Sequence, residues 1–187
     1  METNLLVKDF LKDIKVGAVV QTTSYISKKI IKKINFEQAE IIVEYGSGKG
    51  AITKILLEKL SPNAVLFAFE TNENFIRELS EIQDSRLIVV NSDAECAKRI
   101  LKDKYKIEVV DYIISTIPFS LIEKHKRTRI ISNSFKLLKE TGCFITYQYS
   151  LLIYNLLKKI FKQVKWGFVL LNLPPAFIID GIKMKSN

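Results

Sequence analysis

The stretch 41–50, IIVEYGSGKG, constrains the fold of this 187-residue chain more than any other segment. Apolar residues lead to Glu44, glycines occupy positions 46, 48 and 50, and apolar residues then recur with helical spacing from Ala51. This order predicts a strand, a glycine turn and a helix. Because glycine accepts positive φ angles and lets a backbone approach a ligand closely, we expect a nucleotide-like group against the loop. A purely structural turn is the alternative.

The spacing of the glycines selects among nucleotide ligands. Gly48-Lys49 is followed by Gly50 rather than by Ser or Thr, which excludes a phosphate-binding P-loop. The third glycine of a dinucleotide fingerprint would fall at Ala51, so a variant of that motif stays open. Glu44 would repel a pyrophosphate but attract an ammonium group. The segment thereby resembles motif I of the class I S-adenosylmethionine-dependent methyltransferases, whose loop packs against the amino-acid part of the cofactor.

Two further acids follow predicted strands. Glu70 ends the buried strand 64–69, and a carboxylate twenty residues after Gly50 can accept hydrogen bonds from both hydroxyls of a ribose. Asp93 follows the strand 86–90; the resemblance assigns it to the adenine amine, and the alternative is that it caps the helix 94–101. The resemblance implies further cofactor contacts from Gln21, Thr22, Glu44, Gly46, Ser47, Gly48, Gly50, Thr71, Ala94, Ser115 and Thr116.

The rest of the chain alternates between helical and strand patterns. We expect strands at 109–115 and 143–149, a helix between them that Ser120 caps and Gly142 ends, and a terminal hairpin of 164–171 and 176–182. The fold class is therefore α/β: a Rossmann-like, mostly parallel seven-stranded sheet with helices on both faces and a C-terminal antiparallel hairpin. The resemblance implies the strand order 3-2-1-4-5-7-6.

We expect a single domain over 1–187, with the core at 40–187 and an N-terminal helical segment, 1–35, covering the cofactor site. Residues 4–15 predict an amphipathic helix that either packs on the domain or enters a lipid interface. A second helix, capped by Thr22 or Thr23, would bury Ile26, Ile30, Ile31 and Ile34 and turn Lys28, Lys29, Lys32 and Lys33 outward.

Charge and composition limit the classes of partner that we expect for this protein. Lysine and arginine outnumber the acids 29 to 20, and this favours nucleic acid or an anionic membrane surface, with a generally solvated basic surface as the alternative. No apolar run reaches the roughly 18 residues of a spanning helix and no signal peptide is evident, so we expect a cytoplasmic protein. Cys96 and Cys143 lack metal-ligand spacing, and the lone His125 is expected at the surface; no metal is indicated.

Five segments together resemble the small bacterial phospholipid N-methyltransferases: VGAVVQTTS, VEYGSGKGAITK, VDYIISTIPFS, TYQYS and LNLPPAFI. That family is related to the rRNA adenine dimethyltransferases, which carry an asparagine where this chain has Thr116 and use a C-terminal extension to hold RNA. Ser47 and Lys49 replace the commoner proline and threonine of the phospholipid pattern, and 21–23 replaces a proline-serine-serine sequence. These departures bear on the substrate more than on the cofactor.

The resemblance implies methyl transfer from S-adenosylmethionine to the amine head group of a phospholipid such as phosphatidylethanolamine, at the anionic inner face of the membrane. Tyr25, Phe119, Tyr147 and Tyr149 are candidate walls of the amine pocket, because aromatic faces tolerate a cation, and all four could instead be core residues. An rRNA adenine N-methyltransferase and a non-catalytic cofactor-binding module are the alternatives, and nucleic acid ranks below lipid as the substrate.

Overall fold

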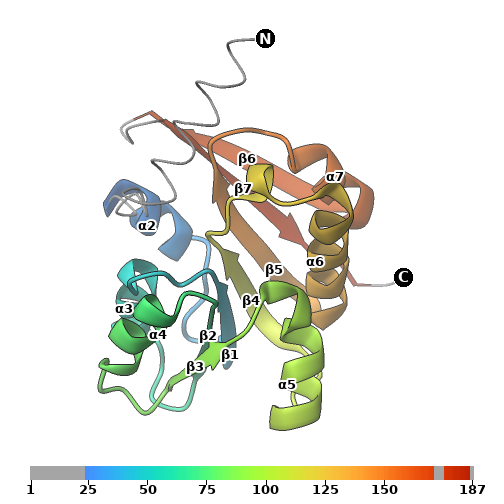
Figure 1. Ribbon diagram of the computed structural model, residues 1–187. Coiled ribbons are helices and arrows are strands. Elements are labelled where there is room, and N and C mark those ends of the chain that lie inside the picture. The colour runs from blue at the N-terminus through green and yellow to red at the C-terminus, as the bar shows by residue number, and fades with distance from the viewer. Residues whose placement is uncertain (1–23, 171–174, 186–187) are drawn as a thin grey trace.

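All seven strands of the computed structural model, which describes residues 24–170 and 175–185, form one sheet in the order β3-β2-β1-β4-β5-β7-β6 (Figure 1). Their bounds are β1 (Ile41–Tyr45), β2 (Val65–Glu70), β3 (Leu87–Asn91), β4 (Val110–Ser115), β5 (Leu138–Gln148), β6 (Gln163–Val169) and β7 (Ala176–Ile182). The strand β7 runs antiparallel to the other six strands. The predicted fold class, strand order and terminal hairpin are confirmed.

The described helices cover both faces of the sheet (Figure 1). On one face lie α2 (Ser24–Ile31), α3 (Ala51–Leu57) and α4 (Glu73–Ser80); on the other lie α5 (Ala97–Tyr105), α6 (Lys124–Leu137) and α7 (Tyr154–Ile160). The central strands are apolar runs because a parallel sheet covered on both faces leaves neither face to water. Residues 66–70 of β2 are buried accordingly.

Side chains along β1 alternate between the two faces of the sheet, and this alternation determines the direction of Glu44. Val43 and Tyr45 belong to the core beneath α5–α7, whereas Ile42 belongs to the core beneath α2 and α3. Since side chains alternate between faces, Glu44 points with Ile42 toward α3. The acid that precedes the glycine loop is thus enclosed between sheet and helix.

The boundary between α6 and β5 differs from the prediction. The helix ends at Leu137 and β5 begins at Leu138, so Gly142 does not end the helix. Gly142 lies in the strand, where a Cβ would come within 2.9 Å of the Lys139 oxygen and 3.0 Å of the Asp111 oxygen. The register between β4 and β5 also shifts after Val110. A glycine is needed there because the two strands approach closely at an irregularity.

Three smaller predictions are also corrected. Ser120 lies in the 3-10 turn η2 (Phe119–Leu121), and α6 starts later, after Glu123. Lys33 does not face outward, because its Nζ donates to Oδ1 of the buried Asp180 at 2.5 Å. Ile31, predicted on the buried face of this helix, is only partly buried, whereas Ile34 is buried although α2 ends at Ile31.

The described residues begin at Ser24, after much of the predicted N-terminal segment. The helix 4–15 and the capping residues Thr22 and Thr23 lie outside the described residues. Within the described ranges, no helix has both the length and the apolarity needed to cross a bilayer.

Candidate functional site

The glycine loop adopts the backbone conformation that its sequence predicts. Gly46, Gly48 and Gly50 have φ angles of 73°, 54° and 80°. The Gly46 N–H donates to the Phe69 oxygen at 2.8 Å, which draws the loop over the end of β2. A Cβ on Gly46 would lie 2.7 Å from Cγ2 of Ile117. Position 46 therefore excludes side chains both by conformation and by space.

We expect Gly46→Ala to weaken cofactor binding and to lower stability by about 1 to 2 kcal/mol, because an L-residue is strained in the left-handed region. Gly167→Ala is the matched control, since a Cβ there meets nothing within 4 Å. Thermal unfolding and calorimetry measure the two effects. Equal behaviour of the two variants would contradict the assigned loop geometry.

Glu70 is tied to backbone amides on both sides. Its Oε2 accepts from the Gly48 N–H at 2.8 Å, and its Oε1 accepts from the Thr71 and Asn72 N–H groups at 2.7 and 2.9 Å. A carboxylate has about four lone-pair positions, so one remains for a ligand. Glu70 consequently links the glycine loop to the start of α4, a role that the sequence argument did not foresee.

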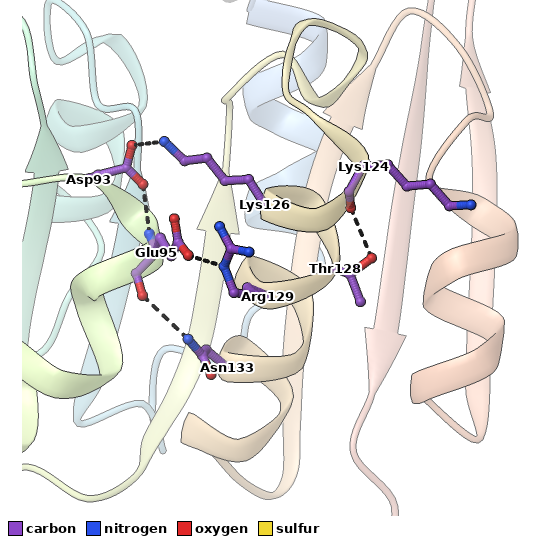
Figure 2. Close-up of polar contacts among 7 residues, drawn as sticks. All are labelled: Asp93, Glu95, Lys124, Lys126, Thr128, Arg129 and Asn133. Atoms are coloured by element: carbon purple, nitrogen blue, oxygen red, sulfur yellow. Dashed lines mark hydrogen bonds and ion pairs between the residues drawn. The ribbon is translucent and has the colours of Figure 1, made fainter.

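Asp93 makes two contacts at the end of β3 (Figure 2). Its Oδ1 accepts from the Glu95 N–H at 2.8 Å, which caps the 3-10 turn η1 (Ala94–Cys96), and its Oδ2 accepts from Lys126 Nζ at 2.5 Å. The bond to Asp93 raises the pKa of Lys126. Figure 2 also shows Arg129 of α6 bonded to Glu95. Asp93 therefore acts as a cap, which is the alternative role that the sequence left open. In addition, Lys126 of α6 competes for the same carboxylate, which is predicted to bind adenine.

A pocket of about 90 Å³ lies among these loops. Five predicted cofactor residues line it: Gly46, Glu70, Thr71, Asp93 and Ala94. The other lining residues are Phe69, Ser92, Ile117, Ile122 and Ile130. Sequence reasoning missed the three isoleucines, which come from the segment after β4 and from α6, because no local pattern indicates that α6 packs beside η1. The pocket is smaller than the roughly 300 Å³ typical of ligand sites, and α6 forms one of its walls.

Glu44 is completely buried, so its side chain is not open to a ligand in this structure. Its Oε2 accepts from Thr53 Oγ1 at 2.6 Å, and its Oε1 has no hydrogen-bond partner. Burial raises the pKa of Glu44 to about 7, against the opposing effect of the Thr53 hydroxyl. The Ser47 hydroxyl is close enough to lower this pKa slightly without meeting the geometry of a hydrogen bond. Thr53, on the buried side of α3, was not identified from the sequence.

The segment after β4 is held by two polar side chains. Thr116 Oγ1 donates to the Gly46 oxygen at 2.5 Å, so this hydroxyl joins the segment to the glycine loop. Gln148, at the end of β5, donates to the Ile117 oxygen at 2.9 Å and accepts from the Phe119 N–H at 3.2 Å. Ser115 is fully buried and its Oγ lacks a partner. Gln148 is a positioning residue that the sequence argument did not single out.

The aromatic residues predicted to line the amine pocket fall into two groups in the structure. Phe119 is fully buried against Phe144, with ring centroids 6.4 Å apart, so its ring belongs to the core. Tyr147 is half-buried and packs edge-on against Tyr149 at 6.1 Å, and Tyr25 is exposed on α2. Of the candidates, only the tyrosines can face an acceptor. Gln21 and Thr22 lie outside the described residues.

The donor set suits the expected cofactor. Glu70 offers a remaining lone pair beside the pocket, and Gly46 lines the pocket with backbone that carries no side chain. Oε1 of Glu44 and Oγ of Ser47 are buried beside the same loop without a hydrogen-bond partner, so polar groups that are not fully paired lie next to the pocket. Among the described residues, no group of three or more His, Cys, Asp or Glu side chains could hold a metal ion.

Comparison with known proteins gives one family. The family model described as ribosomal RNA adenine dimethylase matches residues 21–154. The chain is 26% identical over 181 residues to an ornithine lipid N-methyltransferase from Singulisphaera acidiphila, and the match covers 94% of each chain. It is 34% identical over 108 residues to the ribosomal RNA small subunit methyltransferase A of Mycoplasmopsis pulmonis, which covers 54% of this chain and 41% of that relative.

Solved structures show the same architecture. The N-methyltransferase NodS from Bradyrhizobium japonicum WM9 superimposes with a TM-score of 0.68 at 14% identity, covering 85% of this chain and 94% of the other. An identity this low supports the fold alone.

Proposed function

The chain belongs to the ribosomal RNA adenine dimethylase family of S-adenosylmethionine-dependent methyltransferases, and on that premise we propose that it methylates the primary amine of a membrane lipid. Phosphatidylethanolamine and ornithine lipid are the two head groups to test. The enzyme class and the cofactor follow from the family, whereas the lipid substrate is our proposal.

The extent of similarity supports a lipid over RNA. The match to the ornithine lipid N-methyltransferase covers 94% of this chain and so must include residues after 154, among them β6. The family model and the Mycoplasmopsis ribosomal relative account for less of the chain, and the chain spans only 41% of that relative's length. Similarity that continues past the shared cofactor-binding half favours a shared type of acceptor.

In the proposed mechanism the protein mainly positions two groups and keeps water out. S-adenosylmethionine supplies a methyl group on a sulfonium. Glu70 would hold the ribose, Asp93 the adenine amine, and the glycine loop would allow the close approach. Gln148 would fix the segment 116–119 against which the acceptor amine lies. Orientation of this kind contributes as much as about 7 to 11 kcal/mol in well-aligned systems.

The acceptor must be a neutral amine, because an ammonium has no lone pair to attack with. Its proton would leave to water or to an oxygen at the edge of the site. Tyr25 and Tyr147 remain the proposed walls for the amine, since aromatic faces stabilise the cation formed as methyl groups are added.

We also propose that residues 1–35 cover the cofactor site within a single domain, and that the protein associates with the inner face of the membrane. The net charge of +9 supports an anionic surface as the partner.

RNA methylation is the second candidate, because the family's description names it. We expect purified protein, given labelled S-adenosylmethionine together with amine-lipid vesicles and ribosomal RNA, to place label in the lipid fraction only. The physical reason is that the Thr116 hydroxyl is already donated to Gly46 and the residue has no carboxamide to hold a base edge. Label recovered in adenine would reverse the ranking.

A further inference from the structure

Exposed apolar side chains gather at one edge of the molecule. The described residues include nine large hydrophobic side chains that are exposed, and seven of them lie on segments at or near the carboxyl edge of the sheet. We call six of these the apolar rim: Tyr25, Leu121, Tyr149, Leu152, Phe168 and Leu170. The seventh is Trp166, in β6. Such clustering, in contrast with scattered exposed residues, marks an interaction surface.

The topology explains the clustering. Leu121 follows β4, Leu152 follows β5 and Leu170 follows β6, and these three strands are parallel, so their carboxyl ends share one edge. The two exceptions lie at the opposite edge. Val109 precedes β4, and Met184 follows β7, which runs antiparallel. The apolar rim therefore lies on the same edge of the sheet as the cofactor pocket.

Cations flank the rim. A pocket of about 260 Å³ between α2 and the end of β6 is lined by Tyr25, Lys28, Lys29, Lys32, Val169 and Leu170. Lys29 Nζ donates to the Phe168 oxygen at 2.9 Å, which fixes this cation beside the edge strand. Long lysine stems can lie along apolar surface while their ammonium groups reach an anionic one.

We propose that the apolar rim, together with Lys28 and Lys29 of α2 and Lys32 just after it, forms the surface that docks on an anionic lipid bilayer. Leucine side chains gain free energy by entering hydrocarbon, whereas phosphate groups of RNA offer them nothing comparable. A second copy of the chain would bring the same lysines together and be repelled. The inference rests on the proposed lipid substrate, and it brings the site against the head-group layer.

The sole tryptophan reports on this surface without any engineering. Trp166 is half exposed on the edge strand and contacts Phe177, with ring centroids 5.8 Å apart. Vesicles of phosphatidylcholine with phosphatidylglycerol should shift its emission to the blue, and brominated acyl chains should quench it. Vesicles of phosphatidylcholine alone should do so weakly, and added salt should reduce the effect. Co-sedimentation of the protein without any change in Trp166 emission would overturn the proposal.

Matched pairs of substitutions test the surface. Leu152 and Leu170 are 49% and 70% exposed, and Val109 and Met184 are 50% and 46% exposed at the far edge. Leu152→Asp with Leu170→Asp should weaken vesicle binding at least about tenfold, whereas Val109→Asp with Met184→Asp should leave it unchanged. Equal losses in both pairs would refute the rim. A loss confined to Phe10→Asp, an apolar position of the predicted helix 4–15, would refute it too, since residues 1–23 would then carry the contact.

Activity separates this inference from the proposed function. With a short-chain amine lipid dispersed as monomers, the variant with Leu152→Asp and Leu170→Asp should methylate at the wild-type rate, because docking is no longer needed. A rim variant that is slow on monomers too would contradict a docking role. Wild-type protein that methylates no lipid in either form would defeat the proposed function, while the vesicle measurements would still decide the docking surface.

Discussion

Glu70→Ala is expected to lower the affinity for S-adenosylmethionine at least tenfold. The substitution removes an acceptor beside the pocket and also the three backbone bonds from Gly48, Thr71 and Asn72. Hydrogen bonds to charged groups contribute about 1.5 to 3 kcal/mol each, so the loss of even one ligand bond gives a tenfold effect. Calorimetry measures the affinity, and Glu73→Ala, an exposed acid at the start of α4, is the control for charge alone.

Two roles of Glu70 can be separated by thermal unfolding. If Glu70 mainly ties the glycine loop to α4, the alanine variant unfolds at a lower temperature without cofactor. If Glu70 also binds ribose, the extra stabilisation that the cofactor gives to the wild type is lost as well. A folded Glu70→Ala protein with unchanged cofactor affinity would refute the ribose assignment.

Glu44→Gln is expected to make the cofactor-free protein more stable at pH 8 and to change its pH dependence. The pKa of Glu44 is about 7 in the folded protein, against an ordinary value of 4.5. Between these two pH values the unfolded chain has released the proton and the folded chain still holds it, so stability falls as pH rises and levels off above about 7. The shift corresponds to about 3 kcal/mol.

The difference in unfolding free energy between wild type and Glu44→Gln, measured by denaturant titration from pH 4 to pH 9 at about unit intervals, isolates this group from other titrations. Glu58→Gln, an exposed acid at the end of α3, should show no such trend. A stability difference for Glu44→Gln that is independent of pH would contradict a buried acid with a raised pKa.

The local sequence pattern predicted the architecture well, because each strand and helix near the glycine loop is indicated by the periodicity of its own residues. Gly46, Gly48 and Gly50 predicted positive φ angles, Glu70 was placed by its position at the end of a strand, and Asp93 and Ala94 were placed by the family resemblance; all three of these later residues line one pocket. The start of β5 was missed because the sequence 138–142 is mostly polar and continues a helical pattern, whereas pairing of Leu138 with Val110 makes it a strand. Tertiary pairing overrides propensity there.

Long-range side-chain contacts were also beyond the sequence. Lys126 reaches Asp93 and Thr53 reaches Glu44 only after helices are packed, and nothing in the spacing indicates either pair. Phe119 carried an aromatic signal equal to that of Tyr147, yet the ring turns into the core. Residue type predicts chemistry, and only packing decides which side chains face the ligand.

The most direct test of lipid methylation is to follow the methyl group to its acceptor atom. Purified protein, S-adenosylmethionine with a deuterated methyl group, and vesicles containing phosphatidylethanolamine or ornithine lipid are incubated together, and the lipids are then fragmented in a mass spectrometer. We expect deuterated methyl on the head-group nitrogen with wild-type protein and, at a cofactor concentration below saturation, much less of it with Glu70→Ala. Unlabelled lipid in both preparations, beside labelled adenine in a parallel RNA reaction, would contradict the account.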